Sequence, residues 1–254
     1  MNIIRLSTLV KKETLRFFKV WTQTILSPVM VAILYFAVFG GALSSRITEI
    51  SGISYLAFIV PGLMMLQSTN NAFQNPSSSL TISKYHGTIA DLMTAPLSAL
   101  EKALGYILGG VVRGILVAIA ILITAFPFVD HIFPIHPFWA LFFLVLANAS
   151  FAALGTIVGL WAKTFDHTAG ISTFLITPMG FLGGVFYSVT MLPPLAQTLS
   201  LWNPFLYFVD ALRWAFFNTG DIPIFIDGLV LGGVTLFLCL LTIFLFAKNW
   251  KLQE

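Results

Sequence analysis

Six long apolar segments constrain this chain more than any other feature of its sequence. A helix that crosses the hydrocarbon core of a bilayer needs about 20 mostly apolar residues. Six segments meet that need, over about residues 22–43, 53–75, 104–127, 137–162, 168–187 and 225–247. Only 9% of the residues are charged, whereas soluble domains carry about 25%. The sequence therefore predicts an all-α polytopic membrane protein, a single transmembrane domain over residues 1–254 with six transmembrane helices.

The tryptophans agree with these limits, because Trp side chains favour the interface between membrane and water. Trp139 and Trp161 bracket the fourth segment. The 22 steps between them, at about 1.5 Å each, cover roughly 33 Å, which is close to the thickness of a bilayer core. Trp21 stands directly before the first segment, and Trp250 stands shortly after the sixth.

The distribution of Lys and Arg predicts the orientation, because cytoplasmic loops are rich in these residues. If the N-terminus is cytoplasmic, only Arg46 and Arg213 of the thirteen Lys and Arg residues fall on the outer side. The other eleven are Arg5, Lys11, Lys12, Arg16, Lys19, Lys84, Lys102, Arg113, Lys163, Lys248 and Lys251. We therefore expect both termini in the cytoplasm, with a cytoplasmic tail after the sixth span (225–254).

The first 21 residues predict an amphipathic helix in the inner interface of the membrane. Apolar residues recur at Ile3, Leu6 and Val10, while Lys12 and Arg16 fall largely on the other side of a 3.6-residue helix. An alternative is that this segment only anchors the chain to anionic lipid.

Two connecting segments are unusual. Residues 76–103 form a predicted cytoplasmic loop that is too long for a tight connection between packed helices. Residues 188–224 contain "MLPPLAQTLSLWNPF", which is too interrupted by proline to span and too apolar for a hydrated loop. This pattern favours a re-entrant or interfacial helical hairpin on the outer side, before the last span.

The outer segment also carries an acid and a base three residues apart, Asp210 and Arg213. On a helix these side chains share a face and can pair. Asn203 and Pro204 are suited to begin that helix, as its N-cap and first residue. We expect a structural clasp near the outer surface, and a role in an exit gate is the alternative.

The second span carries a polar stripe. Gln67, Asn70, Asn71 and Gln74 recur at spacings of three and four, which places their amides on one helix face. Buried amides need partners or water, so they either bond to neighbouring helices or line a cavity through which a substrate passes.

The fifth span contains Pro178, which must kink or break a helix. Thr173 and Thr177 stand four residues apart beside it. They either face the same cavity as the amides or satisfy carbonyls freed by the proline.

Catalytic and cofactor motifs are missing from the sequence. There is no G-x-x-x-x-G-K-[ST] phosphate loop and no His, Cys, Asp or Glu set with metal-ligand spacing. The middle of every predicted span also lacks a carboxylate, which ion-driven carriers usually have near the midplane. We therefore expect no catalytic, metal or cofactor site in this chain and no nucleic acid partner, and the missing carboxylates argue against an ion-driven carrier.

Together these features resemble the bacterial type-2 ABC-exporter permeases, the group of polysaccharide, lipo-oligosaccharide and drug exporters. The similarity covers nearly the whole chain and is most specific at "GGVFYSVTMLPPLAQTLSLWNPFLYFVDALRW" (183–214). The stretch "KYHGTIADLMTAP" (84–96) also matches the family's cytoplasmic loop in outline. It departs at Tyr85, His86 and Asp91, where many members have a basic–acidic pair and a Glu.

The resemblance implies a homodimer in the bacterial inner membrane, each subunit bound to a separate ATPase that holds the ATP and magnesium. The N-terminal segment, with Lys12 and Arg16, corresponds to a connecting helix (1–21). The loop corresponds to a coupling helix that seats in the ATPase, and its residues are Lys84, His86, Gly87, Thr88, Asp91 and Leu92. An amphipathic, lipid-linked, glycan or drug-like substrate would pass between the facing second and fifth spans of the two protomers. An ion-driven carrier or channel and a scaffold that transports nothing are the alternatives.

Overall fold

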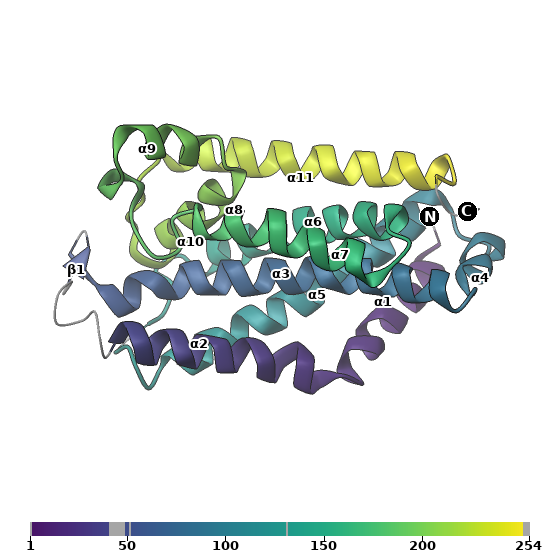
Figure 1. Cartoon of the computed structure of the whole chain (residues 1–254), viewed down its shortest axis with the longest axis horizontal. Coiled ribbons are helices and arrows are strands. Elements are labelled where there is room, and N and C mark those ends of the chain that lie inside the picture. The colour runs from purple at the N-terminus through teal and green to yellow at the C-terminus, as the bar shows by residue number, and fades with distance from the viewer. Residues whose placement is uncertain (1, 41–48, 51, 131, 251–254) are drawn as a thin grey trace.

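The computed structural model describes residues 2–40, 49–50, 52–130 and 132–250. Figure 1 shows a bundle of long helices, with α4, the start of α1 and the end of α11 at one end and β1 and α9 at the other. The elements are α1 (Ile3–Phe18), η1 (Thr22–Leu26), α2 (Ser27–Val38), β1 (Glu49–Ile50), β2 (Ile53–Ser54), α3 (Tyr55–Tyr85), α4 (Ile89–Thr94), α5 (Ala99–Ala125), α6 (Pro137–Trp161), α7 (Phe165–Ile171), η3 (Ser172–Ile176), α8 (Thr177–Phe181), η4 (Val189–Met191), α9 (Pro194–Leu201), α10 (Pro204–Phe217) and α11 (Ile224–Ala247). The two short strands pair antiparallel, Glu49 with Ser54.

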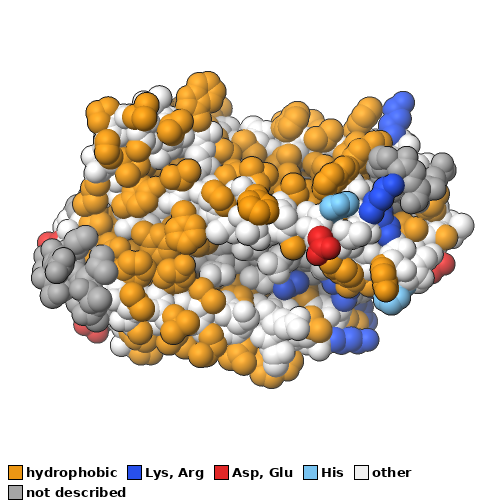
Figure 2. All heavy atoms as spheres, viewed as in Figure 1, with side chains coloured by type: hydrophobic (Ala, Val, Ile, Leu, Met, Phe, Trp, Pro, Cys, Tyr) orange, Lys and Arg blue, Asp and Glu red, His pale blue; other side chains and the backbone are white. Residues whose placement is uncertain are grey.

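The prediction of an all-α polytopic membrane protein is confirmed at this level. Within the described residues, α5, α6 and α11 are long and apolar enough to cross a membrane. The number of candidate spans rises to four if α1 and the η1–α2 helix, which meet at an angle of 78°, form one bent span. Figure 2 shows hydrophobic side chains over most of one face and Lys and Arg gathered toward the end where α1 and α4 lie.

Six spans were expected, and two of the six segments do not meet the same criteria. The α3 helix is long enough, but its second half carries Gln, Ser, Thr and Asn side chains that lower its hydropathy. The segment from α7 to α8 runs from Phe165 to Phe181, shorter than the predicted 168–187 span at its far end, and the π-helical turn η3 interrupts it. The low hydropathy of α3 comes from its polar side chains, and the π-helical turn η3 lies just before Pro178 of α8.

The α3 helix is the centre of the bundle and packs against α5 and α6 along much of its length. Glycines permit this close packing. A Cβ at Gly110 of α5 would lie 2.8 Å from the carbonyl oxygen of Ala72, and one at Gly155 of α6 would clash with the carbonyl oxygen of Phe73. By contrast, a Cβ at Gly228 or Gly232 would meet no described atom within 4 Å.

Several limits differ from the predicted ones. The second span was expected to end at residue 75, but α3 continues to Tyr85, so the start of the predicted loop 76–103 is helical. Pro76 does not end the helix, and α3 continues through it while packed against α5 and α6. The third span begins earlier, at Ala99, where Ser98 and Glu101 form a capping box.

Arg113 corrects the count of basic residues. It was counted with the cytoplasmic side, but the structure places it half-way along α5 and 7% exposed. A Lys or Arg inside a span is not a loop residue, so Arg113 does not contribute to the predicted orientation. Arg46, Lys251 and residues 41–43 of the first predicted span lie outside the described residues.

Candidate functional site

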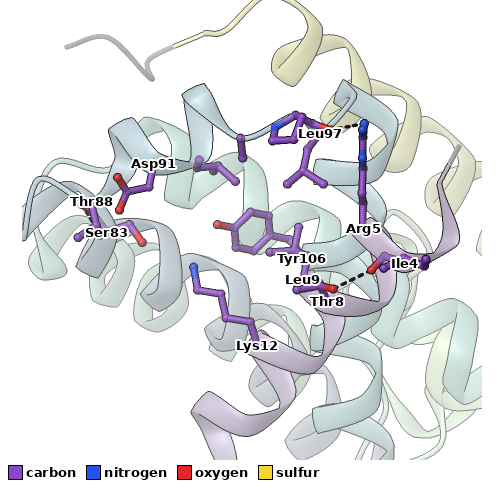
Figure 3. Close-up of a pocket in the computed structure, with 13 residues that line it drawn as sticks. Ile4, Arg5, Thr8, Leu9, Lys12, Ser83, Thr88, Asp91, Leu97 and Tyr106 are labelled. Carbon is purple, nitrogen blue, oxygen red and sulfur yellow. Dashed lines mark hydrogen bonds between the residues drawn. The ribbon is translucent and has the colours of Figure 1, made fainter.

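The first candidate site is a groove between α1 and α4, which we call the α1–α4 groove. It encloses about 390 Å³ beside the end of α3. Its lining residues are Ile4, Arg5, Thr8, Leu9, Lys12, Ser83, Thr88, Asp91, Leu92, Ala95, Pro96, Leu97 and Tyr106. Figure 3 shows the side chain of Lys12 rising from α1 toward the space beside Tyr106, with Asp91 and Thr88 on the side of α4.

Hydrogen bonds fix the position of α1 beside this groove. The N-terminal cap Asn2 donates its backbone N–H to Glu101 Oε1 at 2.6 Å, and Glu101 Oε2 accepts the N–H of Ser98 at 2.8 Å. Arg5 donates to the carbonyl oxygen of Pro96 at 2.5 Å. The groove therefore has one wall from α1 and one from the segment 88–97, and both are attached to the start of α5.

The structure brings four of the eight proposed coupling residues together in this groove: Lys12, Thr88, Asp91 and Leu92. Lys84 instead donates from Nζ to the carbonyl oxygens of Leu160 and Ala162, at the end of α6. His86 and Gly87 form the exposed turn after α3, where Gly87 has a φ of +73°.

Arg16 lies apart from these residues, in a polar cluster between α1 and α3. It donates to Glu13 Oε2 at 3.2 Å and to Asn75 Oδ1 at 2.9 Å. Glu13 is fully buried and also accepts from the Ser79 hydroxyl at 2.8 Å. The acid is therefore matched by a base and a hydroxyl, and the cluster connects the last turns of α1 to α3.

The second candidate site is a cavity of about 600 Å³ between the end of α1, α3, α5 and α7, which we call the polar cavity. Its lining residues are Arg16, Val20, Gln23, Phe73, Gln74, Ser77, Ser78, Ile82, Arg113, Phe165, Thr168, Ala169, Ser172 and Thr173. Amides, hydroxyls and two guanidinium groups dominate its polar lining. Such a mixture can bind a polar head group while the aromatic residues contact an apolar part.

The proposed substrate residues divide between the lining and the wall of this cavity. Gln74 and Thr173 line it. Asn70 Oδ1 accepts from Gln74 at 3.0 Å and from Ser172 at 3.3 Å, so it joins α3 to η3. Asn71 Oδ1 accepts from Arg113 Nε and Nη2 at 3.2 and 3.0 Å.

Like Asn70 and Asn71, the proposed substrate residues Thr177 and Gln67 are not part of the lining. Thr177 donates to the carbonyl oxygen of Ser172 at 3.0 Å, across the turn that precedes Pro178. Gln67 is half-buried one turn before Asn71, whose side-chain amide donates to the Gln67 carbonyl oxygen at 3.0 Å. The structure therefore gives Thr177 a local backbone partner.

The Asp210–Arg213 pair is buried. Asp210 Oδ1 and Arg213 Nη1 lie 3.6 Å apart, and their side chains are 0% and 3% exposed. Asp210 accepts the backbone N–H groups of Asp221 and Ile222 at 3.0 and 2.9 Å. Arg213 donates to the carbonyl oxygen of Gly184 at 2.6 Å. The pair thus connects α10 to two segments that are distant in sequence.

Further contacts surround this pair. The guanidinium carbon of Arg213 lies 3.8 Å from the centre of the Phe58 ring, a cation–π arrangement. Asn203 is the N-cap of α10, with its Oδ1 accepting the N–H of Phe205 at 3.0 Å, and Pro204 is the first residue of the helix. Asn203 also donates to the carbonyl oxygen of Met179 at 2.7 Å.

Comparison with known proteins identifies the family. The model of the ABC-2 type transporter family matches residues 5–217. The chain belongs to the ABC-2 type transporter family. The match covers α1, both walls of the α1–α4 groove, the polar cavity and the Asp210–Arg213 pair.

Named relatives agree with this assignment. The inner membrane transport permease YadH of Escherichia coli strain K12 is 40% identical over 222 residues, which are 87% of this chain and 86% of that protein. Nodulation protein J of Sinorhizobium fredii strain NBRC 101917 / NGR234 is 25% identical over 206 residues, 81% and 74% of the two chains. With its apolar helices, this ABC-2 family member is a multi-pass inner-membrane transport permease.

The sequence reasoning missed two residues of these sites. Glu13 stands three residues before Arg16, an acid–base spacing that predicts a helical pair. Arg113 is a basic residue inside a long apolar segment, and in a membrane such a residue suggests a functional site. Both signals were present in the sequence, but only the fold shows that the two arginines line one cavity.

Proposed function

We propose that this ABC-2 family permease is the membrane subunit of an ATP-driven exporter, with six spans, both termini in the cytoplasm and a second copy of itself as partner. A separate ATPase subunit binds and hydrolyses ATP with magnesium. The substrate is an amphipathic, lipid-linked, glycan or drug-like molecule taken from the cytoplasm or the inner leaflet.

The α1–α4 groove is the observation that carries this proposal. It combines an exposed acid and base, Asp91 and Lys12, with an apolar floor at Leu9, Leu92 and Tyr106. A docked helix or loop of a soluble partner buries such a floor and pairs with such charges. The groove is at the end of the molecule toward which Lys and Arg gather, as expected for a cytoplasmic end.

The six-span count also has structural support. The η1–α2 helix, α3 and the α7–α8 segment accompany α5, α6 and α11 in one bundle. The polar half of α3 packs against α5 and α6, where neighbouring helices and not lipid surround it. A span whose polar side chains face other helices does not need the hydropathy of an isolated span.

Co-purification with a soluble ATPase is the first test. A chain reconstituted with that ATPase transports only when ATP is hydrolysed. Transport in liposomes that contain no ATPase, driven by an ion gradient and indifferent to ATP, would refute the proposal and favour a carrier or channel.

Variants of the groove test the coupling. We expect Asp91→Lys, or deletion of Gly87, to leave assembly in the membrane intact and to uncouple ATP hydrolysis from transport. Asp130→Lys is the matched control, because Asp130 is exposed and remote from the groove lining. Unchanged substrate-stimulated ATP hydrolysis in the groove variants would contradict the coupling role.

Variants of the polar cavity test the proposed export function against the alternative of a scaffold that transports nothing. Substitution of Gln74 or Thr173 by a large apolar residue should reduce transport, because both side chains line the cavity. Normal transport in these variants, and in variants of Gln67, Asn70 and Asn71, would remove the support for a substrate pathway here. The absence of transport by the wild-type complex would favour the scaffold.

A further inference from the structure

Arg113 carries a buried charge that no acid in the described chain neutralises. The residue is 7% exposed and lies half-way along α5, one of the helices apolar enough to span the membrane. Its Nε and Nη2 both donate to one neutral acceptor, Asn71 Oδ1. Burying a guanidinium without a counter-charge is costly, especially within a membrane. A charge kept in such a place needs a further explanation.

The polar cavity provides a place for the missing counter-charge. Arg113 lines this cavity of about 600 Å³, and its Nη1 makes no hydrogen bond to any described residue. Arg16 lines it too, although Glu13 already pairs with that base at 3.2 Å. Among the lining residues there is no Asp or Glu, whereas hydroxyl and amide groups that can donate hydrogen bonds are frequent. The cavity is therefore suited to an anion.

The remaining lining indicates more than a small ion. Phe73, Ile82 and Phe165 present apolar side chains to the same space. The volume is within the range of about 300–1,000 Å³ that small-molecule sites occupy. Arg binds phosphate and carboxylate groups through two parallel hydrogen bonds, and an apolar segment of the same ligand would contact the aromatic side chains.

We propose that the polar cavity is an anion-recognition site, in which Arg113 binds a phosphate or carboxylate group of the transported amphiphile. The assignment of this ligand as the substrate rests on the proposed export function, whereas the binding of an anion here does not. Asn71 positions the Arg113 guanidinium from one side and leaves Nη1 directed to the ligand.

Titration calorimetry on the purified full-length chain in neutral detergent tests the site without any ATPase. The probes are dioctanoyl phosphatidic acid, uncharged dioctanoylglycerol of the same chain length, and inorganic phosphate. We expect phosphatidic acid to bind more tightly than dioctanoylglycerol by about tenfold or more, the size of one charge-assisted hydrogen bond. If inorganic phosphate binds as tightly as phosphatidic acid, the ligand is a free anion and the site recognises the phosphate group alone.

Three variants separate recognition from folding. Arg113→Gln should weaken binding of the anionic probe about tenfold or more, and Arg113→Lys should retain part of it. Asn71→Asp keeps the size of the side chain and gives Arg113 a carboxylate partner, so it should also weaken anion binding even if Arg113→Gln does not fold. Lys19→Gln is the control, because it removes an exposed basic charge that does not line the cavity.

Equal binding of phosphatidic acid and dioctanoylglycerol, with no binding of inorganic phosphate, overturns the proposal. So does unchanged anion affinity in Asn71→Asp and Arg113→Gln. The export function can fail separately: a chain that shows these affinities but never associates with an ATPase keeps its anion site and loses the proposed role in export.

Discussion

Removing the Asp210 carboxylate should destabilise the protein by about 3–5 kcal/mol. Asp210 is fully buried, and it accepts two backbone N–H groups, from Asp221 and Ile222, as well as pairing with Arg213 at 3.6 Å. Asp210→Ala leaves both N–H groups without acceptors and the guanidinium without a counter-charge. Deleting one partner of a buried ion pair typically costs about this much.

The same contacts predict an order between the two halves of the pair. In Arg213→Met the remaining Asp210 keeps its two backbone donors, and the methionine fills much of the vacated volume against Phe58. We therefore expect Arg213→Met to cost less than Asp210→Ala. The double variant should cost less than the sum of the two, because each single change has already removed the ion pair.

Reversible unfolding in mixed micelles, followed by the fluorescence of the six tryptophans, measures these free energies. Asp130→Ala is the control, because an exposed acid changes stability by only about 0.5 kcal/mol or less. A cost below about 1 kcal/mol for Asp210→Ala, or strictly additive single costs, would refute the reasoning. Full stability of Arg213→Glu combined with a loss of transport would instead favour the exit-gate interpretation of the pair.

Three further changes follow from other contacts. Gly62→Val should cost about 1–3 kcal/mol, seen as a lower melting temperature, because its Cβ would lie 2.6 Å from the Val185 carbonyl oxygen. Gly109→Ser would show whether a smaller side chain is tolerated at another close approach, the one between α5 and Glu13 of α1. Asn203→Ala should cost about 1–2 kcal/mol in the same assay, because α10 loses its N-cap, whereas a cost near zero would argue that the cap is unimportant. Lys84→Met should increase hydrogen exchange at the end of α6, since two carbonyls there lose a donor, and unchanged exchange would contradict that role.

The span limits were predictable where the sequence marks both ends. The fourth segment was placed at 137–162 and α6 runs from Pro137 to Trp161, because a proline at the first position and a terminal tryptophan mark these ends. The sixth was placed at 225–247 and α11 runs from Ile224 to Ala247. In both helices local residues determine where the helix begins and ends.

Other features depend on contacts between distant residues. Pro76 suggests an end to α3, yet the helix continues to Tyr85 while it packs against α5 and α6. The partner of Arg113 is Asn71, 42 residues earlier, and the sequence does not reveal that contact. The position of Arg113 inside the predicted span 104–127 was visible in the sequence, but the count of basic residues ignored it and assigned Arg113 to the cytoplasmic side. The burial of Asp210 likewise follows from the backbone of residues 221–222, which spacing within one helix does not reveal.

The two candidate sites are connected by one helix, and this gives the proposed function a physical route. Lys12 lines the α1–α4 groove and Arg16 lines the polar cavity, four residues and about 6 Å further along α1. Between them Glu13 attaches the helix to Ser79 of α3 at 2.8 Å. A partner that moves α1 at the groove must therefore move Arg16 in the cavity or break the buried contact at Glu13, which costs more than a surface contact. Motion at the groove would in this way change the arginine environment in which the anionic substrate is proposed to bind.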